Sequence, residues 1–249
     1  MTDKMTASRS VRRFLATHHP SAFLLAAQLI LLLLYMIFDG LHSQRAMLSG
    51  IGGLILALVV WVVSRTPGSH WIALALAVPA LVLSLLSAVV VNPGLLAWSA
   101  VLEALLYVYA AVNLIVYMMG DFKVTTDELF AAGATFTLLA WAFAYAYLAC
   151  DSWLPGSFVS SFAAGEGHTF IELLSLSFTN LTATGLSDLA PISAPARVLV
   201  MLEQFTGIGY VAVVVSRLIG LSISAITRRK VMLLEEKPEE TRKNFPNKN

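Results

Sequence analysis

A short run of residues in the C-terminal third of the sequence could take the place of water around a cation. A cation that crosses a membrane must exchange water oxygens for protein oxygens, and stacked backbone carbonyls can supply them. The run lies between a short and a long apolar stretch and consists of Thr182, Ala183, Thr184, Gly185, Leu186, Ser187 and Asp188. Gly185 suits such a run, because carbonyls that all point inward require positive φ at some residues. The preceding stretch 169–181 would bring the negative C-terminal end of a helix to the same place.

Acidic residues precede this run or end it, and they would raise the local cation concentration at its outer end. They are Asp151, Glu166, Glu172 and Asp188. We expect Asp188 to brace the run or attract ions, and Asp151 and Glu166 to be solvated loop charges. Glu172 falls in the first turn of the short helix, where a carboxylate stabilises the helix N-terminus and so supports the run. His168 stands beside these acids, and we expect a structural or solvent-facing role, with a pH sensor as the alternative.

The last apolar segment carries an acid and two glycines near the level of the run. An acid inside a spanning helix is costly and indicates a function by default, so we expect Glu203 to support the run from behind. The candidate partners are hydroxyl groups, for example those of Thr179, Thr182 and Thr184. Direct contact with the ion and an interfacial position are the alternatives. Gly207 and Gly209 serve either as a hinge or for close helix packing, and both roles stay open.

The segment 95–119 contains Glu103 and Asn113 but no arginine. A voltage sensor would carry arginines at every third position of its fourth helix, so we do not expect that mechanism here. We expect Glu103 and Asn113 to form hydrogen bonds between helices. A ligand or proton site between the helices is the alternative.

The composition places most of the chain in lipid. Of the 249 residues, 58% are hydrophobic and only 12% are charged, whereas a soluble domain carries about a quarter charged residues. The net charge of +1 implies no nucleic-acid partner. The single cysteine, Cys150, cannot form an intrachain disulfide and is expected to be a small buried hydrophobic residue.

The hydropathy pattern predicts an all-α membrane protein with six transmembrane helices, each close to the ~20 residues that a bilayer requires. The predicted spans are 21–38, 46–64, 71–91, 95–119, 129–150 and 196–221. The stretch 169–181 is too short to span and suits a re-entrant pore helix. Such a helix is stable within the membrane only where protein or water surrounds it.

This pattern divides the chain into an N-terminal tail (1–20), a four-helix domain (21–119), a linker (120–128), a pore domain (129–226) and a C-terminal tail (227–249). Basic residues gather on one side of the predicted spans, which makes that side cytoplasmic and places both termini there. They are Arg9, Arg12, Arg13, Arg65, Lys123, Arg228, Arg229 and Lys230, against Arg45 on the other side. Arg228, Arg229 and Lys230 could also bind anionic lipid.

From about residue 124 onward, the chain resembles the pore domain of small bacterial potassium channels. In that family a pore helix runs into Thr-Thr-Val-Gly-Tyr-Gly-Asp, and Thr182, Gly185 and Asp188 coincide with this filter sequence. The resemblance also covers the segments 155–158, 188–191, 203–210 and 216–220. Such proteins often carry four extra helices before the pore.

The resemblance implies a homotetramer, because each chain supplies one pore segment. It also implies a location in the inner membrane of a bacterium. It implies no cofactor other than a permeant monovalent cation, K⁺ or Na⁺. The carbonyls that it assigns to the ion belong to Thr184, Gly185, Leu186 and Ser187.

The filter departs from the family pattern at four positions. Ala183 lacks the threonine hydroxyl that contributes to the innermost site, and Thr184 adds a hydroxyl that could bond behind the filter. Leu186 replaces a tyrosine and can only pack. Ser187 replaces a glycine, and a left-handed backbone there would cost about 1–2 kcal/mol per subunit. We therefore expect a reshaped outer filter, with K⁺ selectivity favoured by the family and weak selectivity favoured by the substitutions.

The leading hypothesis is a tetrameric channel for monovalent cations. The alternatives are a non-conducting or regulatory membrane scaffold and a proton-coupled transporter that uses Glu103, Asn113 and Glu203. An enzyme is not expected, because the sequence shows no metal-ligand spacing, nucleotide-binding loop or nucleophile–base set.

Overall fold

The computed structural model describes residues 20–38, 70–90, 92–120, 126–160, 168–217, 219–220, 223 and 227. The predicted span 46–64 lies outside the described residues. So do Glu166 and the basic residues on which the orientation rests, including Arg228, Arg229 and Lys230. Those predictions are untested by the structure.

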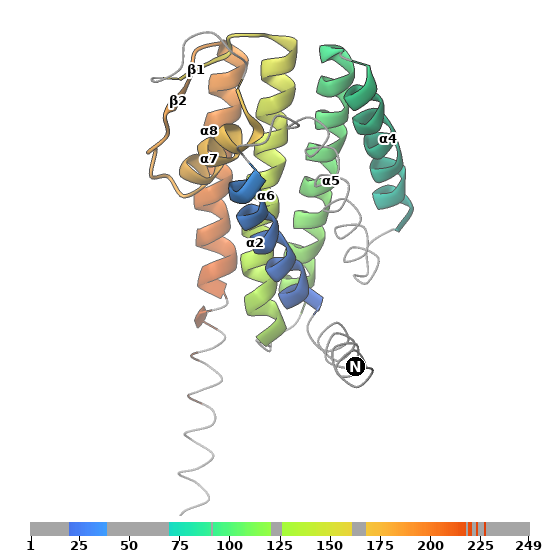
Figure 1. Cartoon of the computed structure of the whole chain (residues 1–249). Helices are drawn as coiled ribbons and strands as arrows, with labels where there is room; N and C mark the ends of the chain where they lie inside the picture. Colours follow the sequence, from blue (N-terminus) through green and yellow to red (C-terminus); the bar gives the residue numbers. More distant parts are fainter. Residues whose placement is uncertain are drawn as a thin grey trace, which may run out of the picture.

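Apolar helices form the N-terminal half of the described chain (Figure 1). They are α2 (Pro20–Phe38), α4 (His70–Val89), α5 (Pro93–Met119) and α6 (Thr126–Trp153). Each agrees with a predicted span to within a few residues, since apolar runs end at strong boundary signals. At the start of α5, for example, the Asn92 side chain accepts from the Gly94 amide at 2.9 Å and Pro93 takes the first helical position.

Among the described residues, 3 helices are long and apolar enough to cross a membrane. They are Pro93–Met119, Asp127–Trp153 and Ala194–Val215, and the shorter apolar helices are Ser21–Leu34, Trp71–Ser87 and Phe170–Leu181. The protein is therefore mostly helical with at least these candidate spans, and the full set of six stays a prediction.

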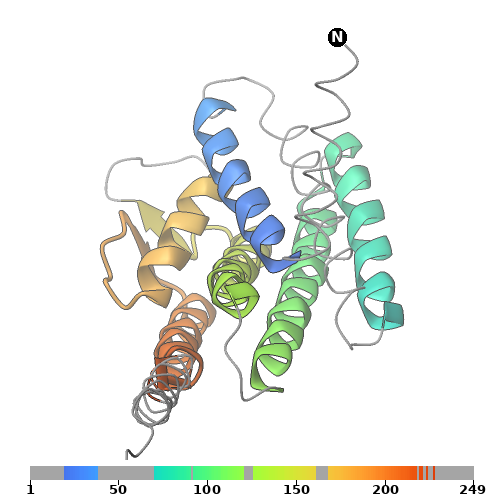
Figure 2. The same cartoon turned by 90° about the horizontal axis from the view of Figure 1, so that it is seen from below.

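Helix α6 is the centre of the molecule, with α2, α5, α7 and α8 arranged around it (Figure 2). Alanines line its buried sides, which allows neighbouring backbones to approach closely. Two buried polar contacts fix α2 against it. The Ser21 hydroxyl donates to Asp127 at 2.9 Å, and the Thr137 hydroxyl donates to the Gln28 side chain.

The C-terminal half contains α7 (Phe170–Leu181) and α8 (Ala194–Tyr210), and α8 continues as the π-helix η1 (Val211–Val215). Ser193 caps α8 by accepting from the Ala196 amide, which explains why this helix begins before the predicted residue 196. The prediction of an all-α fold missed a small antiparallel sheet. Strand β1 (Phe158–Ser160) pairs with β2 (Leu189–Pro191), with Val159 opposite Ala190.

Candidate functional site

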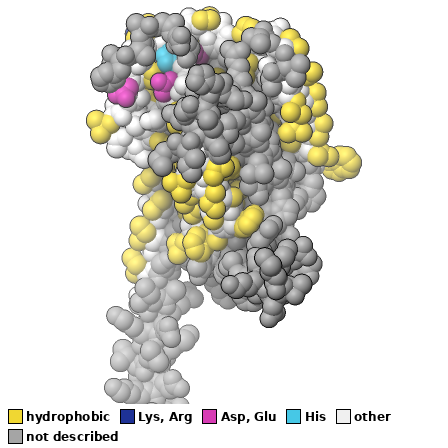
Figure 3. Space-filling model, in the orientation of Figure 1, with side chains coloured by type: hydrophobic (Ala, Val, Ile, Leu, Met, Phe, Trp, Pro, Cys, Tyr) yellow, Lys and Arg dark blue, Asp and Glu magenta, His cyan; other side chains and the backbone are white. Residues whose placement is uncertain are grey.

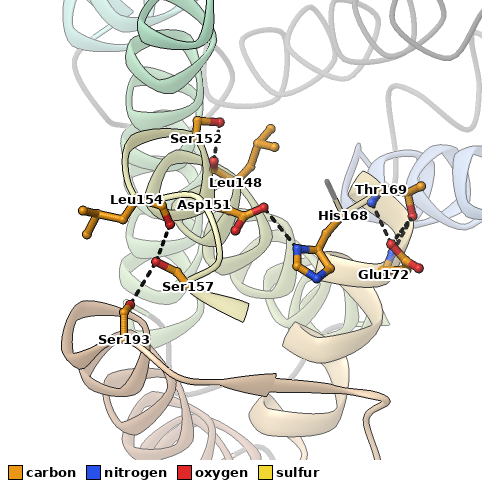
Figure 4. Close-up of polar contacts among 9 residues, drawn as sticks. All are labelled: Leu148, Asp151, Ser152, Leu154, Ser157, His168, Thr169, Glu172 and Ser193. Atoms are coloured by element: carbon orange, nitrogen blue, oxygen red, sulfur yellow. Dashed lines mark hydrogen bonds and ion pairs between the residues drawn. The ribbon is translucent and has the colours of Figure 1, made fainter. Parts of the chain in front are cut away.

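A capping box begins the short helix α7. The Thr169 amide donates to Glu172 Oε2 at 2.7 Å, and the Glu172 amide donates to the Thr169 hydroxyl at 3.4 Å (Figure 4). Glu172 therefore lies in the first turn, as the sequence predicts, and its carboxylate stabilises the start of α7. Support of the run 182–188 by Glu172 stays a prediction.

Asp151 and His168 form a pair that joins the end of α6 to the start of α7 (Figure 4). Asp151 Oδ2 lies 3.1 Å from His168 Nδ1, and the two side chains are 13% and 11% exposed, respectively. The prediction that Asp151 is a solvated loop charge was wrong, because α6 extends past it to Trp153 and places it beside the histidine. His168 has the structural role that the sequence analysis favours.

The run 182–188 begins as a Schellman motif that closes the C-terminus of α7. The Thr184 amide donates to the Thr179 carbonyl at 2.9 Å, and the Ala183 amide donates to the Asn180 carbonyl at 2.9 Å. The hydroxyls of Thr182 and Thr184 also reach the Thr179 carbonyl, at 3.2 and 3.1 Å. This arrangement needs a left-handed residue after the helix, and Ala183 takes that place with φ 57°.

Ser187 does not adopt the left-handed backbone that would strain it, and the strained backbone lies at Ala183 instead. Among the described residues, Ala183 is the non-glycine residue with positive φ, and Gly185 adopts φ 65° at no steric cost. The Ser187 hydroxyl accepts from the Leu189 amide at 3.2 Å, a local turn that serine favours. The outer part of the run is therefore shaped by a serine side chain where the family has glycine.

Most of the run is open to the surroundings in a single chain. Residues 182–186 and Asp188 are exposed, and Leu186 is 83% exposed. The predicted packing of Leu186 does not occur within one chain. The Thr184 hydroxyl does form the predicted additional bond, to the Thr179 carbonyl and to Thr182.

Glu203 lies behind α7 and is fully buried. The Tyr147 hydroxyl of α6 donates to one carboxyl oxygen, and the Ser177 hydroxyl of α7 contacts the other. Ser177 also lies 2.7 Å from the Ala140 carbonyl, and its single proton serves one of these acceptors at a time. Glu203 thus connects α6, α7 and α8 at one point.

The predicted partners of Glu203 were wrong. The hydroxyls of Thr179, Thr182 and Thr184 donate instead to backbone carbonyls of α7. Tyr147 and Ser177 were missed by the sequence analysis. The signal that could have found them is the presence of hydroxyl side chains at matching depth in neighbouring apolar helices, since a buried acid needs donors.

Gly207 allows α8 to cross the end of α7 at close range. A Cβ atom on Gly207 would lie 2.8 Å from the carbonyl carbon of Leu181, whereas one on Gly209 would meet nothing within 4 Å. Of the two roles left open, close packing is therefore observed for Gly207. A hinge at either glycine stays a prediction.

Contacts of two side chains hold the C-terminal end of α8 and the residues that follow it. The Tyr210 hydroxyl donates to the Ala132 carbonyl of α6 at 2.6 Å. Beyond the π-helix, the Arg217 guanidinium donates to the carbonyls of Met118 and Met119 at the end of α5. A cation suits this place, since the C-terminal end of a helix is electronegative.

Of the expected hydrogen bonds between helices, Glu103 forms one with the Tyr145 side chain of α6, whereas Asn113 forms none. The Asn113 side chain donates to the Tyr109 carbonyl of its own helix at 2.7 Å. Glu103 is 3% exposed, and its Oε2 has no hydrogen-bond partner. No group of three or more metal-ligating side chains occurs in the described part of the chain.

Along the chain, α6, the short helix α7, the exposed run and α8 form a long helix, a short helix, a loop and a second long helix. Residues 133–221 match a family model described as an ion channel. These residues are similar to that family, and we call them the ion-channel domain. The resemblance found in the sequence is thereby confirmed at the level of this family, while the filter residues and the helices before the domain remain outside what the match tests. The comparisons with curated proteins and with solved structures give no match.

Proposed function

We propose that the protein is a homotetrameric channel that conducts monovalent cations passively, with K⁺ as the favoured ion. The observation that carries the proposal is the sequence of elements in the ion-channel domain, from the outer helix α6 through α7 and the run 182–188 to the inner helix α8. Carbonyls of Thr184, Gly185, Leu186 and Ser187 are the proposed ion ligands.

Exposed apolar side chains on α8 support the assembly of several chains. Met201, Phe205 and Ile208 recur on one side of α8 and are 61, 79 and 61% exposed. The opposite side carries Glu203 and Gly207, which pack inside the chain. An apolar side next to an exposed filter run is the surface that a fourfold arrangement would enclose.

The polar end of the molecule supports an ion entrance. Acidic and histidine side chains appear near the end that holds β1 and β2, and apolar side chains cover the helices below it (Figure 3). Asp188 is exposed next to the filter run and would attract cations there. The proposed location is a bacterial inner membrane with both termini in the cytoplasm, and Arg228, Arg229 and Lys230 are proposed to meet anionic lipid.

Ion flux from proteoliposomes that contain the full chain tests the selectivity of the proposed channel. We expect flux of K⁺ to exceed that of Na⁺ in the native protein and the difference to grow in the double variant Leu186→Tyr, Ser187→Gly. Native mass measurement of the same preparation should give four chains. A tetramer without flux of either ion in both proteins would favour the non-conducting scaffold instead.

A further inference from the structure

Glu103 is a buried carboxyl group that the ion-channel domain does not include. It belongs to α5, about 15 Å along the axis from the first residue of that helix. The side chain is 3% exposed, and Oε2 has no hydrogen-bond partner. A carboxyl group so placed in a spanning helix is expensive unless it holds a proton or pairs with a cation.

The described residues of α2, α4, α5 and α6 offer no lysine or arginine for such a pair. The one basic type among them is histidine, at His70, which is the first residue of α4. The titratable neighbours are Tyr145, which reaches across from α6, and Tyr107, one turn further along α5. Helix α4 packs on the same helix, and its one titratable residue is His70 at its first position.

Aromatic rings fill the space around this carboxyl group. Tyr107 and Tyr145 stack with centroids 5.5 Å apart, and Trp141 lies 6.3 Å from Tyr107. All three aromatic side chains are buried. Stacked rings leave little volume for an organic amine or a hydrated ion, so a proton is the ligand that suits the site.

We propose that Glu103 is a proton-binding site in the helices before the ion-channel domain, occupied by a proton in the described packing. Binding forms one O–H bond on a carboxylate oxygen, with the proton supplied by the aqueous phase, and neutralises the group. Loss of the proton leaves an ionised carboxylate that requires water or a rearranged donor. The helices around it must then shift.

A continuous set of contacts leads from this site to the pore helix. The Tyr145 ring lies 4.7 Å from Phe170, which is the first residue of α7, and Trp141 lies 5.6 Å from the same ring. A shift of Tyr145 on loss of the proton therefore reaches the base of the helix whose other end carries the filter run. The site would make the position of α7, and with it conduction, depend on pH.

Infrared difference spectroscopy of the full chain in lipid vesicles tests the proton site without requiring ion flux. The native protein should show the carbonyl band of a protonated carboxylic acid that loses intensity as the pH rises. Glu103→Gln keeps the shape and neutrality of the protonated side chain and should remove this band. The matched variant Glu203→Gln, at another buried acid, should leave it in place. A pH-dependent band unchanged in Glu103→Gln, or no such band in the native protein, would overturn the proposal.

A second variant keeps the proposal testable if Glu103→Gln does not fold. Tyr145→Phe removes the neighbouring hydroxyl and should move the frequency of the Glu103 band without abolishing it. An identical spectrum would contradict the assignment. Flux recorded over the same pH range should vary in the native protein and become constant in Glu103→Gln, whereas equal pH dependence in both would remove the link to the pore and leave the channel function itself untouched.

Discussion

At the scale of single residues, the backbone of Ala183 is the point of strain in the filter run. Alanine in the left-handed region costs about 1–2 kcal/mol, and part of this is offset because glycine loses more entropy on folding. We therefore predict that Ala183→Gly raises the free energy of unfolding by up to about 1 kcal/mol. Ser187→Gly serves as the control and should give no gain, because Ser187 has no positive φ and its hydroxyl accepts from Leu189.

Denaturant titration of the native protein and both variants in detergent measures the change in the free energy of unfolding. Equal effects of the two substitutions would show that the left-handed backbone at Ala183 does not persist in the assembled protein.

Removal of the Ser177 hydroxyl has a predictable effect on stability. Ser177→Ala takes a donor from the buried carboxyl of Glu203 and should lower stability by about 1–3 kcal/mol. Ser175→Ala lies on the exposed side of the same helix and should change stability by less than about 0.5 kcal/mol. Thermal unfolding of the two variants separates them, and comparable losses would mean that Glu203 does not depend on this contact.

At the scale of elements, the crossing of α7 and α8 depends on a glycine. A methyl group at position 207 would overlap the Leu181 backbone, so Gly207→Ala must push α8 away from the pore helix at a cost of about 1–3 kcal/mol. Gly209→Ala has free space and should be neutral or slightly stabilising, because alanine favours a helix. Ion flux and unfolding of both variants check this, and a tolerated Gly207→Ala would contradict the close crossing.

The helices could be predicted from the sequence more closely than the contacts between them. Apolar runs and capping residues such as Asn92 and Thr169 are local signals, so the bounds of α5 and α7 agree with prediction to within a few residues. The strands β1 and β2 are three residues each and pair across a long stretch of sequence. A periodic pattern cannot be recognised in so few residues.

The candidate site divides in the same way. Its residues and their order along the chain could be predicted, because the short apolar stretch and Gly185 are visible in the sequence. The partners of Glu203 and the strained position could not, since both depend on how α7 is rotated against α6 and α8. A family pattern pointed to Ser187, whereas the helix-ending motif moved the left-handed backbone to Ala183.

At the scale of the whole molecule, the ion-channel domain is attached to the preceding helices on several levels. The Thr137 hydroxyl of α6 donates to the Gln28 side chain of α2, and Arg217, which follows α8, donates to the Met119 carbonyl at the end of α5. Motion at the C-terminal end of α8 must therefore involve α5. This arrangement physically connects the preceding helices to α6 and α8.

The central claim is that this chain forms a cation-conducting pore, and recording of single-channel currents from the purified full chain in a planar bilayer tests it most directly. With a potassium chloride gradient across the bilayer, we predict discrete currents whose reversal potential lies near that of the cation. No current from folded, tetrameric protein, or a reversal potential near that of chloride, would contradict the account.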